Sequence, residues 1–91
     1  MPDLLHEYWV NAENSAQFGV VRAYNDEVRA TMAPGSKLMF SLHASSWHQA
    51  MKLCQEQLGY DYHPPKDVPN LVYTEAEKAE QQAYLAVRKI G

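Results

Sequence analysis

The feature that most constrains the fold is the run that begins at Lys37, KLMFSLHASSWHQAMKLCQEQLGYDYHPP. In its first eight residues every second side chain is apolar, at Leu38, Phe40, Leu42 and Ala44, and this is the period of a strand with one buried face. Ser46 then forms a capping box with Gln49, the signature of a helix start, and Gly59 supplies a glycine stop. The run therefore predicts a strand over Lys37–Ala44 and a helix over Ser46–Leu58.

The predicted helix is amphipathic and contains the single cysteine of the chain, Cys54. At 3.6 residues per turn, its apolar side chains fall in one stripe. The stripe consists of Trp47, Ala50, Met51, Cys54 and Leu58. A reactive thiolate needs exposure and nearby positive charge, so this position predicts a packing cysteine. One cysteine cannot form an internal disulfide, and we therefore expect a reducing, cytoplasmic setting.

The N-terminal third predicts a hairpin. Leu4–Val10 and Phe18–Tyr24 are rich in aromatic and branched residues and are separated by a polar run, NAENSAQ. Residues 25–33 fit either a helix capped by Asn25 or a continued strand.

A last helix is predicted over Glu75–Ile90, because Thr74 and Glu77 form a second capping box. Small residues dominate its apolar stripe, and we expect this stripe to pack on the sheet. Its members are Ala76, Ala79, Ala83, Val87 and Ile90.

Together these elements predict one α+β domain over residues 1–91. We expect a small three-stranded, mostly antiparallel sheet with one face covered by the Ser46–Leu58 helix and the C-terminal helix. The periodicity leaves the strand order open.

Composition excludes several classes of protein. The apolar fraction of 46% and the charged fraction of 21% are those of a globular domain. The sequence contains no run of about 18 apolar residues, so it predicts no membrane span. We also expect no secretory leader. The net charge is −3, and the lysines and arginines are scattered rather than clustered. A basic patch supplies most of the affinity for phosphates, so this distribution argues against a nucleic-acid partner.

The segment from Ala44 to Met51, ASSWHQAM, is followed eight residues later by GYDYHP, which begins at Gly59. This pair of motifs resembles a family of small bacterial proteins with the pattern A-S-[ST]-[aromatic]-x-x-A-M and then G-[aromatic]-x-x-[aromatic]. The resemblance implies a bacterial or phage cytoplasmic protein. It implies no activity and no site residue.

Candidate catalytic and metal-binding side chains do not converge in the sequence. Zinc needs three or four converging ligands, and the candidates are His43, His48, Cys54 and His63. His48 lies about 120° around the helix from Cys54, so these two diverge. No glycine-rich phosphate loop is present. We therefore predict no catalytic residue, no metal site and no cofactor.

Aromatic residues exceed what one small core needs. Tyrosine is enriched at interfaces because its ring is apolar and its hydroxyl can still form hydrogen bonds. The predicted partner-binding residues are Tyr60, Tyr62, Tyr84 and Leu85. We expect a non-enzymatic interaction module that acts as a homodimer, an adaptor or an inhibitor of another protein.

The alternative prediction is a small enzyme or a ligand-binding protein. Its cleft would lie at the loop and strand–helix corner formed by Tyr60, Asp61, Tyr62, His63, His43 and His48.

Overall fold

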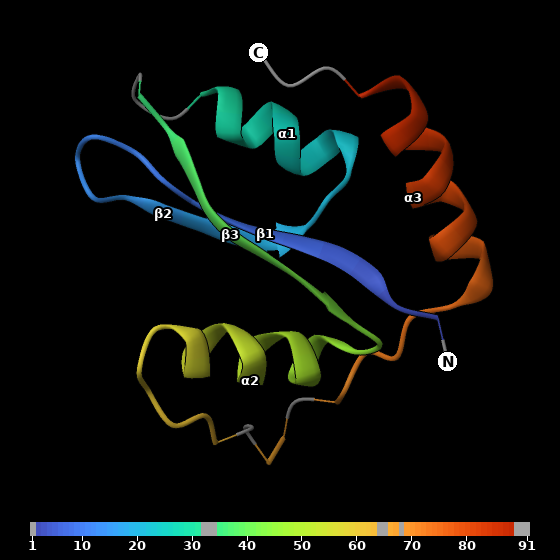
Figure 1. Cartoon of the computed structure of the whole chain (residues 1–91). Helices are drawn as coiled ribbons and strands as arrows, with labels where there is room; N and C mark the ends of the chain where they lie inside the picture. The colour runs from blue at the N-terminus through green and yellow to red at the C-terminus, as the bar shows by residue number, and fades with distance from the viewer. Residues whose placement is uncertain (1, 32–34, 64–65, 68, 89–91) are drawn as a thin grey trace.

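The computed structural model describes residues 2–31, 35–63, 66–67 and 69–88. It is an α+β fold with three strands and three helices among these residues, as the sequence predicts (Figure 1). In chain order the elements are β1 (Leu4–Val10), β2 (Ala16–Val20), α1 (Ala23–Ala30), β3 (Lys37–Ala44), α2 (Trp47–Gln57) and α3 (Glu75–Val87).

The sheet is antiparallel, with strand order β2-β1-β3. His6 in the central strand lies opposite Val20 on one side and Leu42 on the other. A register shift interrupts the pairing of β1 with β3 between Tyr8 and Trp9. Both outer strands therefore have one edge that is not paired within the sheet.

The second strand and the following helix differ from the prediction. β2 is Ala16–Val20 rather than Phe18–Tyr24, and residues 25–30 are helical, in a helix that already begins at Ala23. Asn25 does not cap this helix, because its side chain donates to the carbonyl of Val20 (2.8 Å). That bond satisfies the last carbonyl of the strand and turns the chain into α1. Residues 32 and 33 lie outside the described residues.

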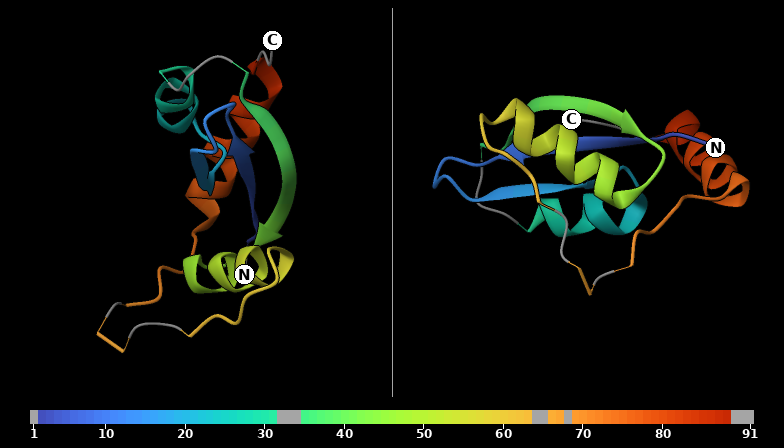
Figure 2. Two further views of the ribbon diagram at one scale, coloured as in Figure 1. Left: turned by 90° about the vertical axis from the view of Figure 1, so that its left-hand side faces the viewer. Right: turned by 90° about the horizontal axis from the view of Figure 1, so that it is seen from below.

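The helices cover both faces of the sheet, whereas the sequence analysis placed two helices on one face. α2 packs on the face that carries His6 and Phe18, since both of these rings contact Trp47. α1 and α3 lie on the opposite face (Figures 1 and 2).

α3 contacts the sheet through polar side chains, so the predicted alanine stripe is wrong. Ala76, Ala79, Ala83 and Val87 are exposed, and Ile90 lies outside the described residues. The buried residue is Gln81, whose amide binds the N–H of Leu5 (2.8 Å) and the carbonyls of Leu5 (3.0 Å) and Val21 (3.1 Å). The β2–α1 corner leaves the N–H of Leu5 and the carbonyl of Val21 without a backbone partner, and a glutamine satisfies both where an alanine cannot.

The predicted caps and the packing cysteine are confirmed in most respects. Ser46 accepts the N–H of Gln49, but the Gln49 side chain binds Ser45 instead of completing the box. The Thr74–Glu77 box is complete. Gly59 ends α2 with a φ of 88°, which favours glycine. Cys54 is buried, and burial raises the pKa of its thiol.

Candidate functional site

The four predicted partner-binding residues lie on two separate parts of the molecule. Tyr60 follows α2 and is 64% exposed, and Tyr62 is half-buried with its ring near that of His48. Tyr84 and Leu85 are near the end of α3, on the far side of the sheet (Figures 1 and 2). Tyr84 is half-buried because its hydroxyl donates to Asp26, while Leu85 is 37% exposed. These residues therefore do not form one surface.

The predicted cleft at the strand–helix corner is only partly assembled. His43, Asp61 and His63 are exposed. The rings of His48 and Tyr62 lie edge to face with centroids 6.4 Å apart. The Nε2 atom of His48 is buried and has no hydrogen-bond partner among the described residues. The geometry shows one aromatic contact here and no converging set of acid and base groups.

A fourth histidine, His6, is fully buried in the centre of the sheet. Its Nδ1 lies 3.0 Å from the carbonyl of Leu4, so Nδ1 carries the proton and donates to that carbonyl. Its Nε2 then accepts from the hydroxyl of Tyr73 (2.8 Å). Burial lowers the pKa of His6 to about 4 and raises the pKa of Tyr73 to about 12. The neutral pair joins the segment before α3 to the central strand.

Charged residues on the opposite face form a buried cluster that the sequence analysis missed. Arg88 donates to Glu7 (2.6 and 3.0 Å) and to Asp26 (both 2.9 Å). Arg29 also binds Asp26 and lies over the ring of Trp9, 4.1 Å from its centroid. Burial is the largest single effect and would raise the pKa values of Glu7 and Asp26. The hydrogen bonds from Arg88 and neighbouring donors, together with the nearby positive charges, outweigh burial and lower both pKa values. This cluster holds α1 and α3 on the sheet.

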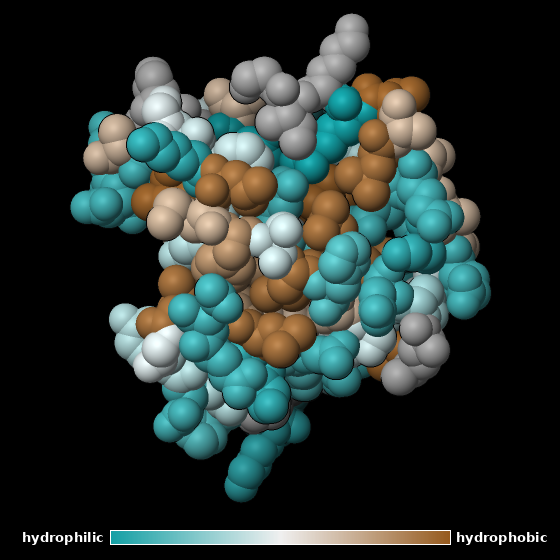
Figure 3. All heavy atoms as spheres, in the orientation of Figure 1, coloured by the Kyte–Doolittle hydropathy of each residue, from teal (hydrophilic) through white to brown (hydrophobic). Residues whose placement is uncertain are grey.

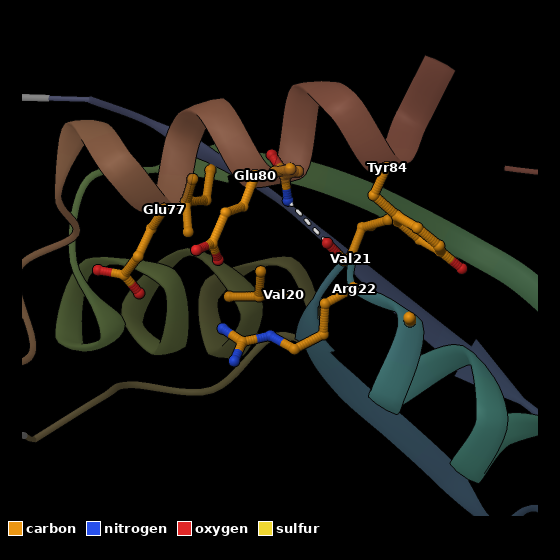
Figure 4. A pocket seen from close by; sticks show the side chains of 9 residues that line it. Val20, Val21, Arg22, Glu77, Glu80 and Tyr84 are labelled. Carbon is orange, nitrogen blue, oxygen red and sulfur yellow. Dashed lines mark hydrogen bonds between the residues drawn. The ribbon is translucent and has the colours of Figure 1, made fainter. Parts of the chain in front are cut away.

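A hollow of about 240 Å³ lies between α3 and the corner that joins β2 to α1. Leu4, Val20 and Val21 line its apolar part. Figure 4 shows Glu77 and Glu80 reaching into it from α3 and Arg22 reaching into it from the corner.

A second hollow of about 430 Å³ adjoins the first and shares Val20, Arg22 and Glu77 with it. We call it the edge groove. Its other lining residues come from β2, from Asn25 in α1, from the start of α2 and from the segment before α3. They include Phe18, Trp47, Leu71, Val72 and Tyr73. Leu71 and Val72 are exposed, at 63% and 47%, so the groove has an open apolar wall.

One wall of the edge groove is the free edge of β2. The N–H of Val21 donates to the carbonyl of Leu5 (2.9 Å), which places Val21 in a hydrogen-bonded pair with β1. Such pairs alternate along an antiparallel ladder. Phe18, three residues earlier, therefore directs its N–H and its C=O away from β1, and no described residue binds either group.

The opposite wall is a short extended segment that pairs with the start of α2. Trp47 donates to the carbonyl of Leu71 (2.9 Å), and Tyr73 donates to the carbonyl of Ser45 (3.1 Å). Val72, between them, forms an isolated bridge with Ser46, so its own N–H and C=O point away from Ser46. Two strand-like edges with free backbone groups thus line one apolar groove. The signal in the sequence was LVY, a β-favouring triplet between a proline loop and the Thr74 cap.

Comparisons with protein-family models, with curated proteins and with solved structures give no match to this chain. The resemblance of the segment that begins at Ala44 to small bacterial proteins therefore stays a prediction. Among the described residues, no group of three or more histidine, cysteine, aspartate or glutamate side chains could hold a metal ion. No helix in the described part of the chain is long and apolar enough to cross a membrane.

Proposed function

We propose that this protein is a non-catalytic interaction module whose edge groove binds an extended segment of another polypeptide. The observation that carries the proposal is that two residues with free backbone groups, Phe18 and Val72, both line one groove with an apolar part. An added strand satisfies such groups with main-chain hydrogen bonds, and pockets for alternate side chains give it specificity.

The chemistry of the groove supports a peptide with alternating apolar and polar residues. Side chains on one face of an extended peptide would rest on Trp47 and Phe18, which lie 5.9 Å apart between ring centroids. Arg22 and Glu77 lie at the polar side of the groove with opposite charges. An acidic side chain of the peptide could pair with Arg22, and a basic side chain could pair with Glu77.

The acidic residues and histidines support a catalytic role less well than the groove supports binding, because the buried ones are already paired with other protein groups. His6 is buried and neutral, and its two nitrogens are both occupied. The charged cluster around Arg88 is also internally paired. The predicted ligand cleft at Tyr60–His63 with His43 and His48 stays the alternative proposal.

Selection from a random heptapeptide library against the purified protein tests the function. We expect enriched peptides with alternating apolar residues, and we expect N-methylation of their backbones to abolish binding because it removes the N–H donors. Val72→Pro should also weaken binding, since it removes a groove donor that has no internal partner. The matched control is Leu85→Glu, a change on the other side of the sheet. Peptides that bind Val72→Pro and N-methylated forms as well as wild type would contradict the proposal.

A further inference from the structure

The outer edge of β3 is a second free strand edge, separate from the edge groove. No described helix or strand lies beyond it, and β3 forms the outermost strand of the sheet in Figure 2. Because Leu5 accepts from Val21, the residue after β2, Leu5 directs its backbone groups towards β2, and the alternate residues of β1, such as His6 and Tyr8, bond to β3. In β3, Phe40 and Leu42 then direct their backbone N–H and C=O groups towards β1. Ser41 and His43 direct theirs away from the sheet, at its free edge.

The surface around this edge is apolar. Leu38 and Met39 are 44% and 59% exposed, and Phe40 and Leu42 are half-buried. Figure 3, which looks onto the β3 side of the molecule, shows apolar side chains gathered across the middle of this face. Natural edge strands are protected by prolines, central charges, β-bulges or a covering element. The register shift at Met39 is such a bulge, and it leaves the part of β3 from Phe40 to Ala44 regularly paired. β3 has one charged residue, Lys37 at its start, and no proline.

We propose that β3 pairs antiparallel with β3 of a second copy of this chain, about a two-fold axis at Ser41. Ser41 of one copy would then face Ser41 of the other as a hydrogen-bonded pair, and the two sheets would form one sheet of six strands. The inference goes beyond the proposed function and does not depend on it, because the edge groove is lined by β2 and β3 is the strand at the opposite edge of the sheet.

The register places compatible side chains opposite one another. Phe40 of one copy faces Leu42 of the other in a non-hydrogen-bonded pair, where side chains approach most closely. Phe40 is already stacked on Tyr8, with ring centroids 4.9 Å apart, so it enters the contact in a fixed orientation. Lys37 and Ser45 lie outside the regular pairing, because the register shift at Met39 interrupts β3 and the carbonyl of Ser45 already accepts from Tyr73. No like charges face each other across the axis.

The chain exposes more surface than a folded monomer of its mass. The chain exposes 6158 Å², whereas a folded monomer of 10.4 kDa exposes roughly 5,400 Å². The excess of about 750 Å² is shared between Leu38 and Met39 at the β3 edge and exposed side chains elsewhere, such as Tyr24, Tyr60 and Leu71. Two-fold dimers are also the commonest soluble oligomers.

Sedimentation velocity of the full chain across a concentration series tests the pairing. We expect a dimer for wild type and a monomer for Ser41→Pro, which removes the outward N–H at the axis and leaves the bonds to β1 in place. Met39→Lys, a second variant on an exposed side chain, should raise the dimer dissociation constant by about tenfold or more, because a charged edge resists pairing. Circular dichroism shows whether each variant is folded, and Met39→Lys decides the outcome if Ser41→Pro is not.

Leu85→Glu is the matched control, because it tests the alternative contact through α3. We expect the Leu85→Glu protein to dimerise like wild type. A wild type that stays monomeric throughout the series overturns the proposal. A dimer that survives Met39→Lys but is lost in Leu85→Glu also overturns it, and it assigns the interface to α3 instead.

Discussion

The buried pair formed by His6 and Tyr73 should make the stability of this protein depend on pH above the range where carboxylates titrate. His6 is fully buried and accepts from Tyr73 through Nε2, so protonation at Nε2 breaks the bond and places a charge in the core. Burial lowers its pKa from 6.5 to about 4. The unfolded state therefore binds a proton at a higher pH than the folded state does, and the free energy of unfolding falls as the pH drops from about 6.5 towards 4.

The size of the effect follows from the shift in pKa. Each unit of pKa difference corresponds to about 1.4 kcal/mol. Between pH 7 and pH 5 the unfolded histidine takes up its proton and the folded one does not, so we expect a loss of about 2 kcal/mol. This is a large part of the roughly 5–15 kcal/mol that holds a typical domain together.

Urea denaturation at several pH values measures this loss, and a double variant isolates it. His6→Leu with Tyr73→Phe removes both partners of the His6–Tyr73 bond, and it also removes the donor from His6 to the carbonyl of Leu4. The free energy of unfolding of this variant should change little between pH 7 and pH 5. Tyr73→Phe alone keeps the buried histidine and should keep most of the pH dependence. A wild type whose stability is flat over this range would refute the assignment of His6 as a buried, neutral group.

Three further predictions concern the contacts of α3 and the core. Arg88→Met should cost about 3–5 kcal/mol in urea denaturation, because it leaves Glu7 and Asp26 buried without their main partner; the exposed control Lys52→Met should cost less than about 0.5 kcal/mol. Gln81→Leu should cost at least about 1–3 kcal/mol, since the buried backbone groups of Leu5 and Val21 lose their bonds, and a loss within error would contradict the docking of α3. Native Cys54 should react with a thiol reagent far more slowly than unfolded protein does; equal rates would contradict its burial.

The elements with strong local signals were predictable from the sequence. β1, β3 and the starts of α2 and α3 occur where the alternation and the serine and threonine caps place them. These features depend on neighbours a few residues apart, which a single sequence displays directly.

The docking of α3 and the end of β2 were not predictable by the same reasoning. An apolar stripe normally identifies the buried face of a helix, but α3 buries Gln81 and turns Ala79 and Ala83 outward. The deciding factor is the set of free backbone groups at Leu5 and Val21, which exists only after the sheet has formed. Likewise, β2 ends at Val20 because Asn25 binds its carbonyl from the next element.

The edge groove also depends on contacts between distant segments. Phe18 and Val72 are more than fifty residues apart, and they line one groove only because Tyr73 is anchored to His6 and Leu71 is paired with Trp47. The sequence analysis assigned Tyr60, Tyr62 and Tyr84 to a partner surface. The structure places Tyr73 in the core and leaves Tyr60 exposed.

The most direct test of the proposed binding function is a titration of ¹⁵N-labelled protein with a selected heptapeptide, followed by NMR. The account predicts that the backbone amide signals of Phe18 and Val72 and the indole signal of Trp47 shift together and saturate at one stoichiometry. The amide of Leu85, on the other side of the sheet, should stay in place. Shifts confined to residues around Tyr60, His63 and His48, with Phe18 and Val72 unchanged, would contradict the account and favour the alternative cleft.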